Sequence, residues 1–134
     1  MAAWLAAGSR GGPAPPPSWL FDRVLESLDA SSEVAEGIRR ARRLPPGTHL
    51  SNAAAELGNG SRVLCQDTVP LALWISFSHL DDYRGAILRA IEAGGDTDTT
   101  GAMAGGVVAA RVGTEGIPEE WLLKLEPLPS MEGA

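Results

Sequence analysis

The chain has 134 residues, of which 44% are hydrophobic, and this size suits one compact domain with its own core. Its formal net charge of −6, from 17 acidic and 11 basic residues, argues against binding to nucleic acid or to anionic membrane surfaces. A single cysteine excludes an intramolecular disulfide and a thiolate zinc site built by this chain alone. We therefore expect a protein of a reducing, cytoplasmic setting.

The first 17 residues are predicted to be a Pro/Gly-rich N-terminal segment or linker. Glycine adds backbone freedom and successive prolines remove amide donors in residues 8–17, so neither a helix nor a sheet can propagate there. Residues 1–7 are apolar, but they lack the basic start and the length of a secretory signal. No segment approaches the roughly 18 uncharged apolar residues that a membrane helix needs, so we expect no membrane span.

Two helices are predicted next. Apolar residues spaced by three, four and seven positions indicate a helix over 18–29. Ser32 is a favourable N-cap for a second helix, which ends before Pro45-Pro46-Gly47. This helix carries several arginines towards its end, where they stabilise the negative end of the helix dipole. We favour this structural role for the arginines over phosphate binding.

The middle of the chain contains a turn and a central helix. A short helical stretch over 52–57 is followed by Gly58-Asn59-Gly60-Ser61, which has turn chemistry. This loop is either a plain turn or a backbone that a ligand approaches closely, and the sequence leaves both open. Asp67 or Thr68 is then expected to cap a helix that is apolar on nearly every side and hence central.

Three further helices complete an all-α prediction. Asp81-Asp82 opens a helix that ends at Gly94-Gly95. Its predicted buried side consists of Ile87, Leu88 and Ile91. The next helix, from Thr99 to about Val112, has a small residue at every fourth position, which indicates close approach of another helix. A short helix over 119–125 follows.

The segment Asp96-Thr97-Asp98-Thr99 carries the main chemical signal. Two carboxylates and two hydroxyls concentrate the hard oxygen ligands that Mg²⁺ prefers. The alternative is that Asp98 or Thr99 merely caps the following helix. A calcium-binding EF-hand is excluded, because the twelfth loop position is Val107 rather than the bidentate glutamate.

The flanking motifs carry a family resemblance. They are Gly94-Gly95-Asp96-Thr97-Asp98-Thr99, the glycine- and alanine-rich stretch 101–113, the loop 57–60, the segment 67–74, and Ile117-Pro118 with Trp121. In this order they resemble the C-terminal portion of the ADP-ribosylglycohydrolase family, of the dinitrogenase-reductase-activating glycohydrolase type. The resemblance implies that 18–129 form part of an orthogonal all-helical ADP-ribosylglycohydrolase domain, followed by a tail at 130–134.

The resemblance also implies a function. Family members use two Mg²⁺ ions, with Mn²⁺ as the alternative metal, to hold the ribose of ADP-ribose while its bond to a protein or small molecule is hydrolysed. Asp96, Asp98 and Thr99 correspond to the C-terminal metal ligands. Gly58, Asn59 and Gly60 lie in a segment that resembles the family's loop, and they are our candidate substrate-binding residues because a ligand can approach this backbone closely. The remaining metal ligands and acid/base carboxylates lie in an N-terminal half with a Thr-Asp-Asp segment. Nothing equivalent precedes residue 96 here, so no catalytic residue is assigned.

Three functional hypotheses follow. The first is a truncated C-terminal part of a Mg²⁺-dependent ADP-ribosyl hydrolase. The second is a non-catalytic helical module that binds ADP-ribose or is purely structural, and the third is one half of a split enzyme completed by a complementary N-terminal chain. Loss of half a domain is expected to expose the apolar faces around Trp74 and Val107.

Overall fold

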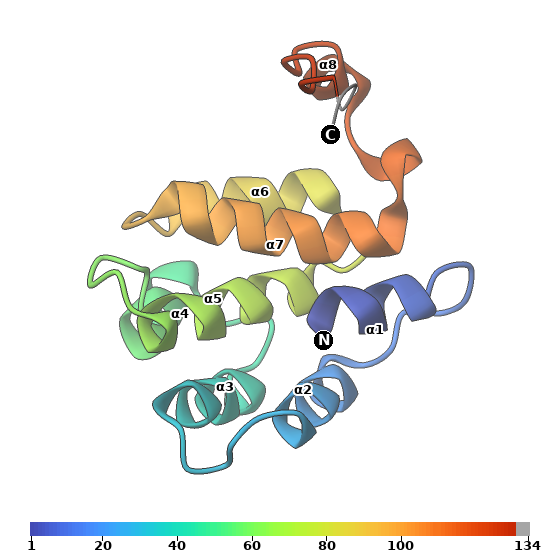
Figure 1. Ribbon diagram of the computed structural model, residues 1–134. Helices are drawn as coiled ribbons and strands as arrows, with labels where there is room; N and C mark the ends of the chain where they lie inside the picture. Colours follow the sequence, from blue (N-terminus) through green and yellow to red (C-terminus); the bar gives the residue numbers. More distant parts are fainter. Residues whose placement is uncertain (131–134) are drawn as a thin grey trace.

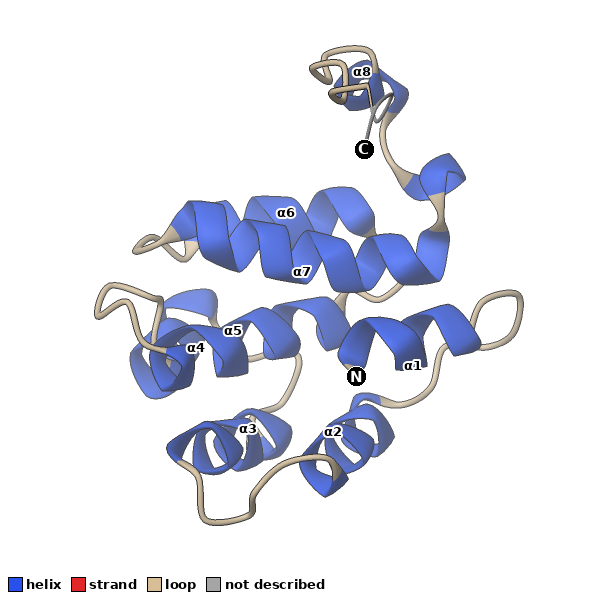
Figure 2. Cartoon of the chain, viewed as in Figure 1, coloured by secondary structure: helices blue, strands red, loops and turns tan. Residues whose placement is uncertain are grey.

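The computed structural model describes residues 1–130, and its regular secondary structure in that range consists of helices joined by loops, with no strand (Figures 1 and 2). The predicted all-α class is therefore confirmed, whereas the predicted tail lies outside the described residues except for Ser130. The helices are α1 (Ala2–Gly8), α2 (Pro17–Glu26), α3 (Glu33–Arg43), α4 (Leu50–Leu57), α5 (Cys65–Ser78), α6 (Tyr83–Glu92), α7 (Thr97–Val112) and α8 (Glu119–Leu122), with a 3₁₀ turn, η1 (Thr114–Gly116).

The central helix is α5, which lies between α3 on one side and α7 on the other (Figure 1). Its buried residues run almost without interruption from Thr68 to Phe77, as the apolar composition predicts. Trp74 is only 4% exposed, and its indole N–H donates to the Leu44 carbonyl at 3.2 Å, which satisfies the one polar atom of this core side chain. No helix in residues 1–130 has the length and apolar character needed to cross a membrane.

Helix caps show where local sequence decides the structure. Ser32 Oγ accepts from the Ala35 N–H at 3.1 Å at the start of α3, and Asp82 accepts from the Gly85 N–H at 2.9 Å at the start of α6, as predicted. The start of α5 differs from the prediction, because the helix begins at Cys65 rather than after Asp67. The carboxylate of Asp67 instead accepts from the Arg62 N–H at 2.8 Å, which fixes the preceding loop.

The N-terminal segment differs from the predicted linker. Residues 2–8 form α1, which packs on α7 and buries Leu5 and Ala6, while only residues 9–16 form a connecting loop. A helix of seven residues is marginal in isolation. The stability of α1 therefore comes from packing on α7, which lies about a hundred residues further along the chain. The local composition of residues 1–17 does not reveal this contact.

The packing of α6 on α7 corrects the predicted buried side of α6. Leu88 and Ile91 are 45% and 55% exposed, and the fully buried residues are Ala86 and Ala90. A Cβ atom added at Gly105 of α7 would lie 2.9 Å from Ile87 Cδ1. Ile87, which is half-buried, and Tyr83 of α6 lie against this bare position, so the absence of a side chain at Gly105 lets α6 pack closely on α7, as predicted.

The apolar faces around Trp74 and Val107 are covered, contrary to the expectation for a half domain. Val107 is 9% exposed, and helices α1, α5 and α6 all pack against α7. The most exposed large apolar side chains lie elsewhere, at Trp4 in α1, at Val63 in the loop before α5, and in the segment after α8, where Leu128 is 91% exposed.

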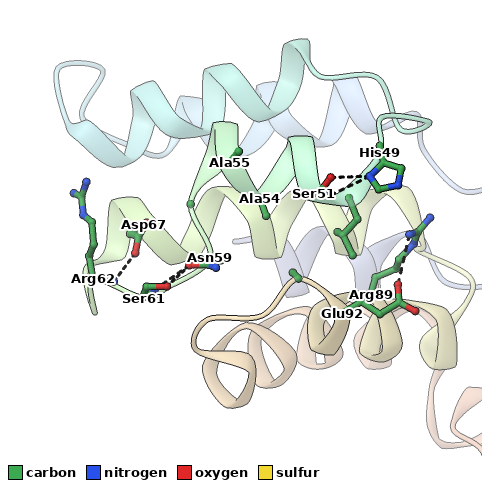
Figure 3. A pocket seen from close by; sticks show the side chains of 13 residues that line it. His49, Ser51, Ala54, Ala55, Asn59, Ser61, Arg62, Asp67, Arg89 and Glu92 are labelled. Carbon is green, nitrogen blue, oxygen red and sulfur yellow. Dashed lines mark hydrogen bonds and ion pairs between the residues drawn. The ribbon is translucent and has the colours of Figure 1, made fainter.

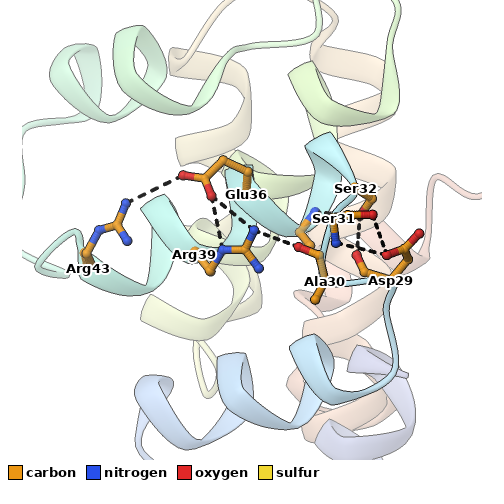
Figure 4. A network of polar contacts seen from close by, with 8 residues as sticks. Asp29, Ala30, Ser31, Ser32, Glu36, Arg39 and Arg43 are labelled. Carbon is orange, nitrogen blue, oxygen red and sulfur yellow. Dashed lines mark hydrogen bonds and ion pairs between the residues drawn. The ribbon is translucent and has the colours of Figure 1, made fainter.

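Arg39, Arg42 and Arg43 of α3 have partners within the described residues, whereas the buried Nε of Arg40 has none. Arg39 donates to Glu36 at 3.1 Å and to the Ala30 carbonyl at 2.9 Å, which ties α3 to the loop before it (Figure 4). Arg42 donates to Asp22 of α2 at 2.6 Å, and this hydrogen bond lowers the pKa of the Asp22 carboxyl below its usual value.

Candidate functional site

The acidic motif forms the start of α7. Asp96 is the N-cap residue, and its Oδ1 accepts from the Thr99 N–H at 3.2 Å. The capping role considered for Asp98 or Thr99 thus belongs to Asp96. Asp98 and Thr99 lie in the exposed first turn, so their oxygens face solvent and remain accessible to a ligand.

The loop at 58–61 is held in a tight conformation that only glycine adopts easily. Gly58 and Gly60 have φ values of +91° and +84°. The Gly60 N–H donates to the Asp67 carbonyl at 2.8 Å, and the Asn59 side-chain oxygen accepts from the Ser61 N–H at 3.2 Å and also from the Ser61 hydroxyl. The loop is therefore a fixed element, as its turn chemistry predicts.

The structure brings the loop and the acidic motif together. The Asp96 N–H donates to the Asn59 carbonyl at 3.0 Å, although the two residues are far apart in the chain. A Cβ atom on Gly60 would lie 2.9 Å from Asp96 Cβ, and one on Gly95 would overlap Asn59. The predicted substrate-binding loop and the predicted metal-ligating segment thus form one continuous surface.

The oxygen atoms of the acidic motif are of the type that a hard cation such as Mg²⁺ prefers. One carboxylate oxygen of Asp96 caps α7 by accepting a hydrogen bond. The Asp98 carboxylate does not cap the helix, and Thr99 adds a hydroxyl group. These hard oxygens suit Mg²⁺, and the two negative charges offset the positive helix end that would otherwise repel a cation. Within the described residues no three His, Cys, Asp or Glu side chains are grouped to hold a metal. The residues present fit one wall of a metal centre and are too few for two ions.

A pocket of about 700 Å³ adjoins this surface (Figure 3). It shares Gly58 and Asn59 with the loop and is completed by His49 at the start of α4, Arg62 after the loop, and Arg89 near the end of α6. Sequence reasoning missed these three cationic or titratable residues. They come from separate elements and form no local motif, so only the fold identifies them as neighbours.

A sequence model of the family described as ADP-ribosylglycohydrolase matches residues 1–133. The chain belongs to the ADP-ribosylglycohydrolase family. This assignment confirms the resemblance carried by the acidic motif and its flanks. It extends the matched region to the N-terminal residues that the motifs left out, in keeping with the packing of α1 on α7.

Several family members and other relatives are similar over parts of the chain. An uncharacterized protein of Archaeoglobus fulgidus is 31% identical over 114 residues, which are 84% of this chain and 35% of that protein. The ADP-ribosyl-[dinitrogen reductase] glycohydrolase of Rhodospirillum rubrum is 41% identical over 46 residues, or 34% of this chain and 16% of that enzyme. Mouse ADP-ribosylhydrolase ARH3 is 32% identical over 77 residues, or 50% of this chain and 20% of that enzyme.

The aligned regions therefore span between about a sixth and about a third of these relatives' own lengths. No solved structure gives a significant match to the chain.

Proposed function

We propose that this chain forms the C-terminal wall of a Mg²⁺-dependent hydrolase centre that removes ADP-ribose from a modified protein or small molecule. The observation that carries the proposal is the hydrogen bond from the Asp96 N–H to the Asn59 carbonyl, at 3.0 Å. It joins the family's acidic motif to a glycine loop whose bare backbone can lie close to a ligand. The names of the Rhodospirillum and mouse relatives support ADP-ribose as the group removed.

In this proposal Asp96, Asp98 and Thr99 hold Mg²⁺, with Mn²⁺ as the alternative. The metal supplies orientation of the ribose hydroxyls and stabilisation of negative charge. The glycine loop forms the opposite side of the ligand site, through Gly58, Asn59 and Gly60. The rigid loop then fixes the ribose in one orientation, since it does not have to be ordered when the ligand binds.

Two carboxylates leave the proposed centre short of negative ligands. We infer that further carboxylates come from outside these 134 residues, on a complementary N-terminal half that is either part of a longer chain or a separate partner. The alternative function is a non-catalytic helical module that binds ADP-ribose or is purely structural. The covered core around Trp74 and Val107 favours it, because this body does not need another half to bury its apolar residues.

The metal site is tested by titrating the folded chain calorimetrically with ADP-ribose, with and without Mg²⁺. We expect Mg²⁺ to strengthen binding, and Asp98→Asn to weaken Mg²⁺-dependent binding by about tenfold or more, because one of two carboxylates is lost. Asp96→Asn should act similarly while keeping an N-cap, since asparagine caps as well as aspartate.

The matched control is Asp82→Asn, which makes the same change at the N-cap of α6, away from the loop. It should bind as the native chain does. Equal binding by the native and Asp98→Asn chains, or a folded native chain whose ADP-ribose binding ignores Mg²⁺, would contradict the proposed metal site. A second test adds a complementary N-terminal half to the folded chain and measures release of ADP-ribose from a modified substrate. Hydrolysis in the mixture would support the enzyme hypothesis over the non-catalytic module.

A further inference from the structure

Two exposed tryptophans line an apolar groove between α1 and α2. Trp4 of α1 and Trp19 of α2 are 73% and 43% exposed, and the groove that they line has a volume of about 490 Å³. Pro13 and Pro15, from the loop that joins the two helices, also line it. Tryptophan is a largely buried residue in most proteins and is enriched at the centres of protein interfaces. The groove therefore has the composition of a docking site.

The segment after α8 is exposed and carries two prolines. Residues 125–130 have no regular secondary structure, and Leu125 and Leu128 are 69% and 91% exposed. Pro127 and Pro129 flank Leu128, and each favours an extended backbone at the residue before it. Segments of this type dock in aromatic-lined grooves, because their extended conformation is already formed before binding. The groove and the segment thus have matching chemistry.

The charges of the groove and the segment are also complementary. Arg10 is the one charged residue that lines the groove, and it donates a hydrogen bond to the Ala110 carbonyl at 2.7 Å. Neither Arg10 nor the exposed Glu126 of the segment forms an ion pair within residues 1–130. A guanidinium has five N–H donors, so Arg10 retains donors for a carboxylate.

The segment does not reach the groove of its own chain. Helix α8 is held at the start of α6, where Arg84 pairs with Glu120 and its guanidinium carbon lies 4.9 Å from the ring centroid of Trp121. From there the segment extends away from α1 and α2, with α6 and α7 between them (Figure 1). The groove that this segment can enter is therefore that of a second copy.

We propose that residues 125–129 of one copy of this chain dock between Trp4 and Trp19 of a second copy. Leu128 enters the groove, and Glu126 pairs with Arg10 at its edge. The contact joins two different surfaces, so it closes as a dimer when each copy fills the groove of the other. Because a single short segment forms it, we expect weak, concentration-dependent association. The proposal is independent of the proposed function, since it involves neither the acidic motif nor the glycine loop.

The first test uses a labelled synthetic peptide of residues 123–130 and measures fluorescence anisotropy as the native chain is added. We expect saturable binding below about 1 mM chain. Leu128→Ser and Glu126→Lys in the peptide should each weaken binding by about tenfold or more, because the first removes the apolar contact and the second places like charges together. The control peptide carries Lys124→Gln and should bind as the native peptide does.

Variants of the chain locate the binding surface. Trp4→Ala should weaken peptide binding by about tenfold or more and leave the fold intact, because this side chain is 73% exposed. The control is Leu88→Ala, which removes another exposed apolar side chain from a helix, outside the groove. Equal peptide binding by the native and Trp4→Ala chains, or none by the native chain, would overturn the proposal.

The second test is sedimentation velocity of the whole chain over a range of concentrations. The average mass should rise above the 14.0 kDa of one copy, and Leu128→Ser and Trp4→Ala should each reduce this rise. A native chain that stays monomeric at concentrations where the peptide binds would show that the occupant is not a second copy. Self-association that persists unchanged in both variants would place the contact elsewhere and would also overturn the proposal.

Discussion

Gly95→Ala is expected to displace the acidic motif from the glycine loop and to abolish Mg²⁺-dependent ligand binding. Gly95 has a φ of +69°, so alanine is strained there. Its Cβ would also overlap the Asn59 carbonyl oxygen, a backbone atom that cannot rotate away. Strain and overlap together should lower the free energy of unfolding by about 3 kcal/mol, measured by urea denaturation.

Gly94→Ala provides the control for backbone strain alone. Gly94 has nearly the same φ, +70°, but no atom lies within 4 Å of the position of an added Cβ. We expect it to cost about 1 kcal/mol and to leave ligand binding intact. If both variants lose the same stability and both keep binding, contact between Gly95 and the loop does not position the acidic motif.

The acidic motif and the loop could be found from sequence because each has a local chemical signature. Consecutive oxygen ligands mark the first, and glycines flanking Asn59 mark the second. The contact between the acidic motif and the loop is a tertiary contact, and no local sequence pattern predicts it. The pocket residues are harder still to predict, because Arg62 and Arg89 are single surface arginines until the fold places them around one cavity.

The same distinction applies to the helices. Ser32 and Asp82 were predictable as caps, because capping depends on a hydrogen bond three residues away. The buried side of α6 was not. Size and hydrophobicity favoured Leu88 and Ile91, but α6 turns Ala86 and Ala90 into the core and packs Ile87 against Gly105 of α7. The contact between α6 and α7 decides which face of α6 is buried. The sequence of α6 alone does not reveal this contact.

Arg111→Met is expected to loosen the N-terminal segment and destabilise the chain by about 2–3 kcal/mol. Arg111 is only 8% exposed, and its guanidinium donates to Asp81 at 2.8 Å, to the Gly12 carbonyl at 2.6 Å and to the Ser9 carbonyl. Methionine keeps most of the apolar volume but leaves both carbonyls without this donor. Amide hydrogen exchange in α1 should accelerate more than exchange in α5.

Arg10→Met is the control, because it removes another hydrogen bond between the N-terminal segment and α7. Arg10 donates to the Ala110 carbonyl at 2.7 Å, but it is exposed, so water can replace the lost donor. We expect a cost below about 0.5 kcal/mol and little change in α1 exchange. Similar losses from both variants would mean that Arg111 is one surface contact among several. A large loss from Arg111→Met alone would establish that the N-terminal segment is an integral layer of the helical body, because its burial would then depend on a buried contact with α7.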